Sequence, residues 1–116
     1  MIKRASEHKH DVSSALFGGS GDVIFDRIIE TPAELMGKGR VFSVTTLPAG
    51  SELGWHVHNG DCEFYHIISG SAEYNDNGTV TTLNAGDTSF TPSGEGHSIK
   101  NVSDAPCVFI ALVLYC

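Results

Sequence analysis

Two histidines and a glutamate in the middle of the chain have the types and the spacing of metal ligands. His56 and His58 alternate in the segment 54–58, whose neighbours are typical of a β-strand. Because successive side chains of a strand point to opposite faces, the two imidazoles are expected to share one face. Glu63 follows after a turn and shares its predicted face with Tyr65. A carboxylate on an apolar face is unfavourable unless it is paired or bound to a metal.

A third imidazole, His97, comes from a distant segment in which Ile99 marks the inward face by the same alternation. Three neutral imidazoles and one carboxylate form a mixed nitrogen and oxygen ligand set that suits manganese, iron, nickel, copper or zinc. Calcium and magnesium prefer more oxygen ligands. We therefore predict one divalent transition metal, held by His56, His58, Glu63 and His97.

The rest of the sequence predicts the short β-strands that would hold these residues. Turn signals rich in glycine, asparagine and proline recur at short intervals, and the runs between them are rich in Val, Ile, Thr, Phe and Tyr. This spacing is typical of an all-β sandwich or barrel. The clearest hairpin is 71–83, where Asn77-Gly78 suits a type I′ turn. We expect one short helical turn at 31–37, capped by Thr31 and closed by Gly37.

The four candidate ligands stand within two longer motifs. The first, G-x5-H-x-H-x4-E-x6-G, is formed by Gly50, His56, His58, Glu63 and Gly70. The second, G-x5-P-x-G-x2-H-x3-N, is formed by Gly86, Pro92, Gly94, His97 and Asn101. In both motifs the chain resembles the cupin superfamily, and it looks most like the small single-domain bacterial cupins often called oxalate-decarboxylase-like. The resemblance implies a double-stranded β-helix, a conical antiparallel jelly-roll barrel with its metal near one mouth.

Composition and charge limit the partners and the compartment. We expect one barrel domain at residues 21–116, preceded by a weakly patterned arm at residues 1–20 that packs on a neighbour. Seven basic and fourteen acidic side chains give a net charge of −7, which disfavours nucleic acid and anionic membranes as partners. Without a secretory signal or a cysteine framework, the chain is expected to be cytoplasmic. A short barrel with exposed edges also predicts a homodimer.

Other candidate residues have simpler interpretations. His8 and His10 repeat the H-x-H spacing, but no partner carboxylate is evident, so we interpret them as surface residues. Cys62 replaces an acidic residue found in many such cupins, and like His66 it falls out of phase with the predicted ligand face. Aromatic residues in strands are usually core residues. Tyr65 is the one candidate catalytic residue, because its predicted face puts a phenol close to the carboxylate of Glu63.

Two functions from different classes remain open. In the first, the protein is a metalloenzyme that acts on a small organic acid, an enediol or a sugar-derived carboxylate chelated at the metal. The resemblance implies decarboxylase, dioxygenase, isomerase or lyase chemistry. In the second, the barrel binds a sugar or organic acid without turnover. A barrel that has lost its metal is a further alternative, but four buried titratable groups would then need many hydrogen bonds.

Overall fold

Alternating apolar and polar residues between tight turns produce ten β-strands and three short 3₁₀ turns in the computed structural model, which describes residues 1–116. The 3₁₀ turns are η1 (Ala5–Glu7), η2 (Leu16–Gly18) and η3 (Pro32–Leu35). The strands are β1 (Lys9–Ser14), β2 (Asp22–Arg27), β3 (Gly39–Leu47), β4 (Glu52–Val57), β5 (Asp61–Ser69), β6 (Ser71–Asp76), β7 (Thr79–Asn84), β8 (Thr88–Thr91), β9 (Gly96–Lys100) and β10 (Cys107–Tyr115).

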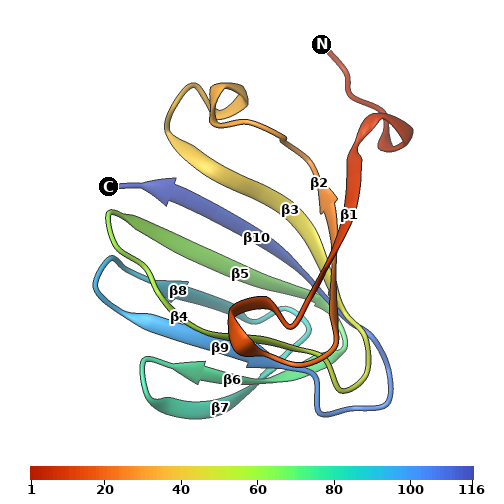
Figure 1. Cartoon of the computed structure of the whole chain (residues 1–116), viewed down its shortest axis with the longest axis vertical. Helices are drawn as coiled ribbons and strands as arrows, with labels where there is room; N and C mark the ends of the chain where they lie inside the picture. Colours follow the sequence, from red (N-terminus) through yellow and green to blue (C-terminus); the bar gives the residue numbers. More distant parts are fainter.

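The strands form two antiparallel sheets that face each other (Figure 1). The six-stranded sheet has the order β1-β2-β3-β10-β5-β8, and the four-stranded sheet has the order β4-β9-β6-β7. Neighbouring strands that are distant in sequence, such as β3 and β10, pair antiparallel. This arrangement confirms the predicted all-β double-stranded β-helix. No helix in the structure has the length and apolar character needed to cross a membrane.

The core lies between the sheets and is built from the inward face of each strand. Along β10 every second residue from Cys107 to Val113 is buried. Inward side chains such as Phe109, Ile67 and Ile99 are fully buried. Tyr65 and Tyr74 are also buried here, which places two phenol groups in the interior beside the histidines.

Two local predictions are confirmed. Strands β6 and β7 form a hairpin around Asn77-Gly78, where φ is 48° and 104°. A type I′ turn requires positive φ at both of these positions. The helical turn is η3, in which Thr31 and Glu34 form a capping box around Pro32 at its first position.

The segment expected as an N-terminal arm contains a strand of the six-stranded sheet. Strand β1 pairs with β2 over its whole length, from Lys9 opposite Arg27 to Ser14 opposite Asp22. The pairing uses backbone hydrogen bonds and polar side chains, which explains why the apolar pattern of residues 1–20 is weak. Its packing on a neighbouring molecule stays a prediction.

Candidate metal centre

Two strands of one sheet and one strand of the other bring the four candidate ligands together. His56 on β4 lies directly opposite His97 on β9 in the four-stranded sheet. Glu63 extends from β5 of the facing sheet. His58 follows the end of β4, and its backbone is fixed by two hydrogen bonds: its N–H donates to Glu95, and its carbonyl accepts from Gly94.

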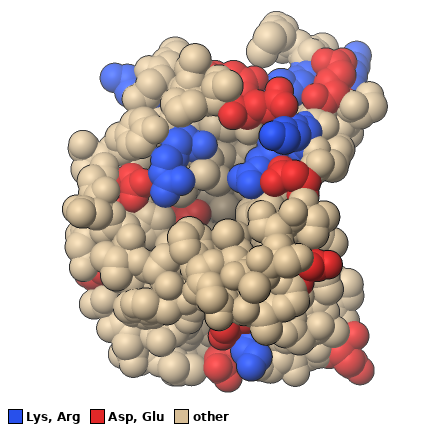
Figure 2. Space-filling view, in the orientation of Figure 1, with Lys and Arg blue, Asp and Glu red and all other residues tan.

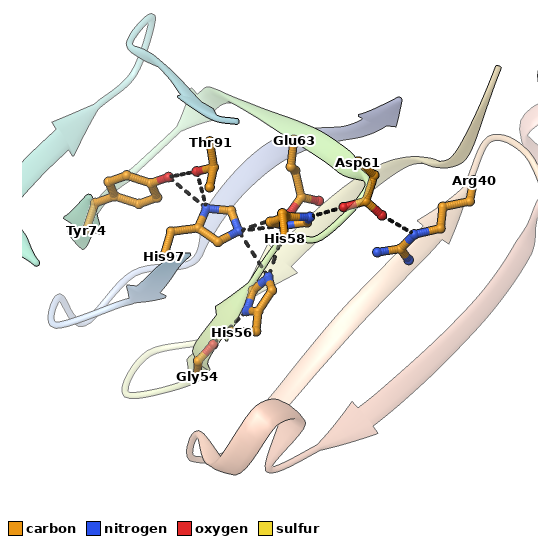
Figure 3. Close-up of polar contacts among 9 residues, drawn as sticks. All are labelled: Arg40, Gly54, His56, His58, Asp61, Glu63, Tyr74, Thr91 and His97. Carbon is orange, nitrogen blue, oxygen red and sulfur yellow. Dashed lines mark hydrogen bonds and ion pairs between the residues drawn. The ribbon is translucent and has the colours of Figure 1, made fainter. Parts of the chain in front are cut away.

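The ligand atoms of these residues converge on one point (Figure 3). The Nε2 atom of His97 lies 3.0 Å from Nε2 of His56, 3.2 Å from Nε2 of His58 and 3.0 Å from Oε1 of Glu63. Oε1 of Glu63 is also 3.1 Å from Nε2 of His58 and 3.8 Å from Nε2 of His56. All four ligand atoms lie within 4.8 Å of one another.

Each imidazole is oriented by a partner on its other nitrogen. Nδ1 of His56 lies 2.8 Å from the carbonyl oxygen of Gly54. Because a carbonyl only accepts, His56 carries its proton on Nδ1 and presents the Nε2 lone pair to the centre. Nδ1 of His58 likewise lies 2.7 Å from the carboxylate of Asp61. Such partners fix the tautomer and the ring orientation that metal binding requires.

The third imidazole is held by two hydroxyl groups. Nδ1 of His97 lies 2.7 Å from the hydroxyl of Tyr74 and 3.0 Å from that of Thr91. The ring of Tyr65 stacks on the imidazole at a centroid distance of 4.8 Å. His97 is therefore fixed by hydrogen bonds at one end and by an aromatic face along its side.

Burial and mutual contact shift the pKa values of the cluster. Burial raises the pKa of Glu63, but the hydrogen bonds from the three imidazoles outweigh it and hold the pKa well below its usual range. Burial lowers the pKa of His97, which favours the neutral imidazole that coordination needs. The hydrogen bond to Glu63 raises the pKa of His58. The cluster thus combines an ionised carboxylate with three imidazoles that are held in place through their outer nitrogens.

This donor set fits a divalent transition metal. Two atoms that bind one ion at about 2.1 Å and at right angles lie about 3 Å apart, which matches the four shortest spacings in the cluster, 3.0 to 3.2 Å. Nitrogen lone pairs directed at one another at this distance repel unless a cation or proton lies between them. A group of three histidines and one glutamate that could hold a metal is present, as the sequence predicted.

Asp61 links His58 of the candidate metal centre to Arg40 at the surface, as Figure 3 shows. The carboxylate of Asp61 accepts from His58 with one oxygen and, at 2.8 Å, from Nε of Arg40 with the other. Burial raises the pKa of Asp61, but the hydrogen bonds from Arg40 and His58 outweigh it and lower the pKa overall. Asp61 is therefore ionised at neutral pH and strengthens His58 as a ligand.

Replacing Asp61 by alanine should weaken metal affinity by about 10- to 100-fold, the range expected when the partner of a ligating histidine is lost. His58 would lose the acceptor that fixes its tautomer. Calorimetric titration of metal-free protein with Mn²⁺ measures the change. Asp104→Ala, at an exposed loop position, is the matched control and should bind like wild type. Equal affinities for the two variants would contradict the role assigned to Asp61.

The cluster lies at one wall of a cavity of about 180 Å³. Phe17 from η2 stacks on His56 at a centroid distance of 4.2 Å. Phe25 and Arg27 from β2 and Arg40 from β3 also line the cavity. The segment before β3 therefore builds part of the cavity wall.

The other aromatic residues divide between the core and the surface. Tyr65 and Phe109 line the cavity. Trp55, Phe90 and Tyr115 are exposed. Burial raises the pKa of Tyr65 well above its ordinary value, so its phenol is protonated at neutral pH.

The remaining histidines lie outside the cluster. His66 is exposed and bonds Thr88, as expected from its outward phase. His8 and His10 are also separate from the cluster, but the expectation that they lack a partner carboxylate is wrong. Asp26 lies 2.8 Å from His8 and 3.4 Å from His10. It reaches them because β1 pairs with β2, a long-range contact that the H-x-H spacing does not reveal.

Comparison with known proteins decides the family. A family model described as Cupin domain matches residues 43–114. The chain is a cupin. The four candidate metal ligands and both glycine-containing motifs lie inside the matched region.

Relatives of this cupin carry names that refer to oxalate. The chain is 37% identical over 114 residues to an oxalate-binding protein of Thermotoga maritima, covering 98% of this chain and 93% of that protein. It is 36% identical over 75 residues to oxalate decarboxylase OxdC of Bacillus subtilis, covering 60% of this chain but only 19% of that enzyme.

Solved structures agree with the fold. A Thermotoga maritima protein described as a predicted oxalate decarboxylase has a TM-score of 0.94 and 35% identity over 100% of both chains. A Klebsiella pneumoniae protein with a double-stranded β-helix domain has a TM-score of 0.72 and 29% identity, covering 98% of this chain and 89% of that one.

Proposed function

We propose that this cupin binds a small carboxylic acid through one divalent transition metal held by His56, His58, Glu63 and His97. The observation that carries the proposal is the convergence of four oriented ligand atoms at the wall of a cavity. A bound divalent ion supplies open coordination positions and Lewis acidity for a carboxylate. The name of the Thermotoga maritima oxalate-binding protein supports the same class of ligand.

The charges around the centre favour an anion. Arg40 is paired with Asp61, and Arg27 is paired with Asp11, so each pair is close to neutral. A divalent ion beside the single carboxylate of Glu63 leaves one positive charge in a largely buried site. A carboxylate ligand neutralises this charge, which makes its binding favourable in a region of low dielectric constant.

The test is a titration of purified protein loaded with Mn²⁺, Fe²⁺, Ni²⁺, Cu²⁺ or Zn²⁺. We expect about one metal per chain, and we expect oxalate or a related small acid to bind the metal-loaded form but not the chelator-treated form. Calorimetry measures both steps. Protein that takes up none of the five metals, or that binds acids equally well without metal, would contradict the proposal.

Turnover is a second candidate function, which the position of Tyr65 favours. Its side chain lines the cavity, and burial together with the charge of Glu63 raises the pKa of its phenol. The phenol is a proton donor for a group that forms beside the metal. Assays of the metal-loaded protein under air and under nitrogen separate turnover from binding, and Tyr65→Phe should then lose turnover while retaining metal.

We also propose that two copies pair through the outside of the six-stranded sheet. An antiparallel sheet that faces water usually carries polar residues on its outer side, and β6 and β9 of the four-stranded sheet do so with Glu73, Asn75, Ser98 and Lys100. The six-stranded sheet instead has an outer apolar face formed by Phe42, Val44, Phe64, Phe90, Ile110 and Leu112.

These residues are direct neighbours across four strands. Leu112 on β10 lies opposite Phe42 on one side and Phe64 on the other, and Phe64 lies opposite Phe90. Soluble domains rarely expose a contiguous apolar surface of this kind without a partner. A second copy offers the same surface in a two-fold arrangement, so the outer apolar face supports the predicted homodimer. The cytoplasmic location stays a prediction.

A further inference from the structure

The walls of the cavity are mostly apolar. Nine of the sixteen residues that line it are hydrophobic. Among them, Leu16, Phe17 and Phe25 come from the N-terminal part of the chain, while Leu53, Phe109 and Val113 come from the barrel strands. Apolar walls gain free energy by burying apolar ligand atoms. Oxalate consists of two carboxylates and has no apolar part, so it would leave these walls without a partner.

A polar chamber continues beyond the apolar walls. A second cavity of about 240 Å³ is lined by Lys9, Asp11, Ile29 and Glu30, and it shares Arg27, Arg40 and Val41 with the first cavity. The two arginines therefore mark the boundary between the two spaces. In the space-filling view, basic side chains lie on both sides of a hollow in the surface (Figure 2).

Arg40 has unpaired hydrogen-bond donors at this boundary. Its Nε donates to Asp61, and its two terminal nitrogens have no partner in the protein. The side chain is 46% exposed. Arg27 has less capacity, because both Nε and Nη2 donate to Asp11 while the guanidinium lies over the ring of Phe25. The terminal edge of a guanidinium matches the two oxygens of a carboxylate.

The volumes of the two cavities also favour a ligand longer than oxalate. A cavity of about 150 Å³ accommodates benzene, so the inner cavity alone holds a ligand of roughly that size. Oxalate has the same number of non-hydrogen atoms as benzene and would not reach into the second cavity. A ligand that uses both spaces must be longer.

We propose that the ligand has three parts: a carboxylate head that chelates the metal, an apolar chain along the cavity walls, and a second anionic group that binds Arg40. This inference rests on the proposed metal-dependent binding of a carboxylic acid. It assigns Arg40 as the residue that selects a longer dicarboxylic acid over oxalate or a monocarboxylic acid.

The experiment compares acids that share a 2-oxocarboxylate head. Protein loaded with Mn²⁺ is titrated by calorimetry with oxalate, pyruvate, 2-oxohexanoate, 2-oxoglutarate, 2-oxoadipate and 2-oxopimelate. 2-Oxohexanoate and 2-oxoadipate have the same chain length and differ only in a terminal methyl or carboxylate group. We expect at least one of the longer diacids to bind about tenfold or more tightly than 2-oxohexanoate, and 2-oxohexanoate to bind more tightly than pyruvate.

Arg40→Gln should then remove the advantage of the diacid, measured as the ratio of the affinities for 2-oxoadipate and 2-oxohexanoate in the same variant. Lys100→Gln, which removes the same charge on the far sheet, should retain the advantage. Titration of each metal-free variant with Mn²⁺ shows whether the centre is intact, because Arg40 also contacts Asp61.

The outcomes separate the two proposals. If oxalate or pyruvate binds as tightly as every longer acid, or if the Arg40 variant retains the preference for diacids, the three-part ligand is wrong and metal-dependent acid binding stands. If no acid binds the metal-loaded protein, the proposed function itself fails and this inference fails with it.

Discussion

Replacing His97 by alanine should weaken metal binding by at least about a hundredfold, since the loss of even an indirect partner of a ligand costs 10- to 100-fold. His97 is fully buried, and its Nε2 contacts all three of the other candidate ligands. Alanine would remove a coordinating nitrogen and open that position to water. Calorimetric titration of the metal-free variant with Mn²⁺ or Zn²⁺ gives the affinity.

Two variants serve as controls for His97→Ala. His66→Ala and the double change His8→Ala with His10→Ala remove imidazoles that lie outside the cluster. Both should bind metal nearly as wild type does. Because His97 also contacts Tyr74 and Thr91, circular dichroism must show that the variant is folded at the temperature of the titration. Equal metal affinities for folded His97 and His66 variants would mean that the centre lies elsewhere.

Replacing Phe64 by glutamate should convert the dimer into a monomer. Phe64 lies within the outer apolar face, stacks on Phe90 at a centroid distance of 4.7 Å and is 36% exposed in the single chain. Two copies related by a two-fold axis would each bury a carboxylate against apolar side chains, which is strongly unfavourable. Sedimentation or light scattering should give twice the chain mass of 12.4 kDa for wild type and the single mass for the variant.

Val80→Glu is the matched control for the dimer. It makes the same kind of change at an exposed position, opposite Asn75 on the four-stranded sheet. This variant should remain dimeric. A wild type that is monomeric at micromolar concentration, or a Phe64 variant that keeps the dimer mass, would contradict pairing through the six-stranded sheet. Thermal unfolding shows whether each variant is folded.

The parts of the structure that follow from local pattern could be predicted from sequence. Alternation alone puts Glu63 and Tyr65 on one face, and both are buried as expected. His97 and Ile99 are buried by the same rule. The turn at Asn77-Gly78 follows from residue type, because few other residues adopt positive φ in succession.

The surroundings of the centre could not be predicted in this way. Phe17 meets His56 only because η2 folds back onto β4, and the conformation of Phe17, with φ at 52°, is one that its residue type does not suggest. Arg40 reaches Asp61 from a different strand. Asp61 itself lies three residues after His58, at the start of β5, so its sequence position gives a signal that an analysis of acidic residues near candidate ligands could have used.

The cavity draws part of its wall from a stretch of the chain that supplies none of the candidate metal ligands. The four candidate ligands lie between residues 56 and 97, within the region that the cupin family model matches, whereas Phe17, Phe25, Arg27 and Arg40 precede that region. Substitutions before residue 43 can therefore change which acid fits without altering the atoms that hold the ion. In evolutionary terms, the chemistry of the centre and the choice of ligand can diverge independently. Relatives with the same ligands but a different N-terminal segment should prefer different acids.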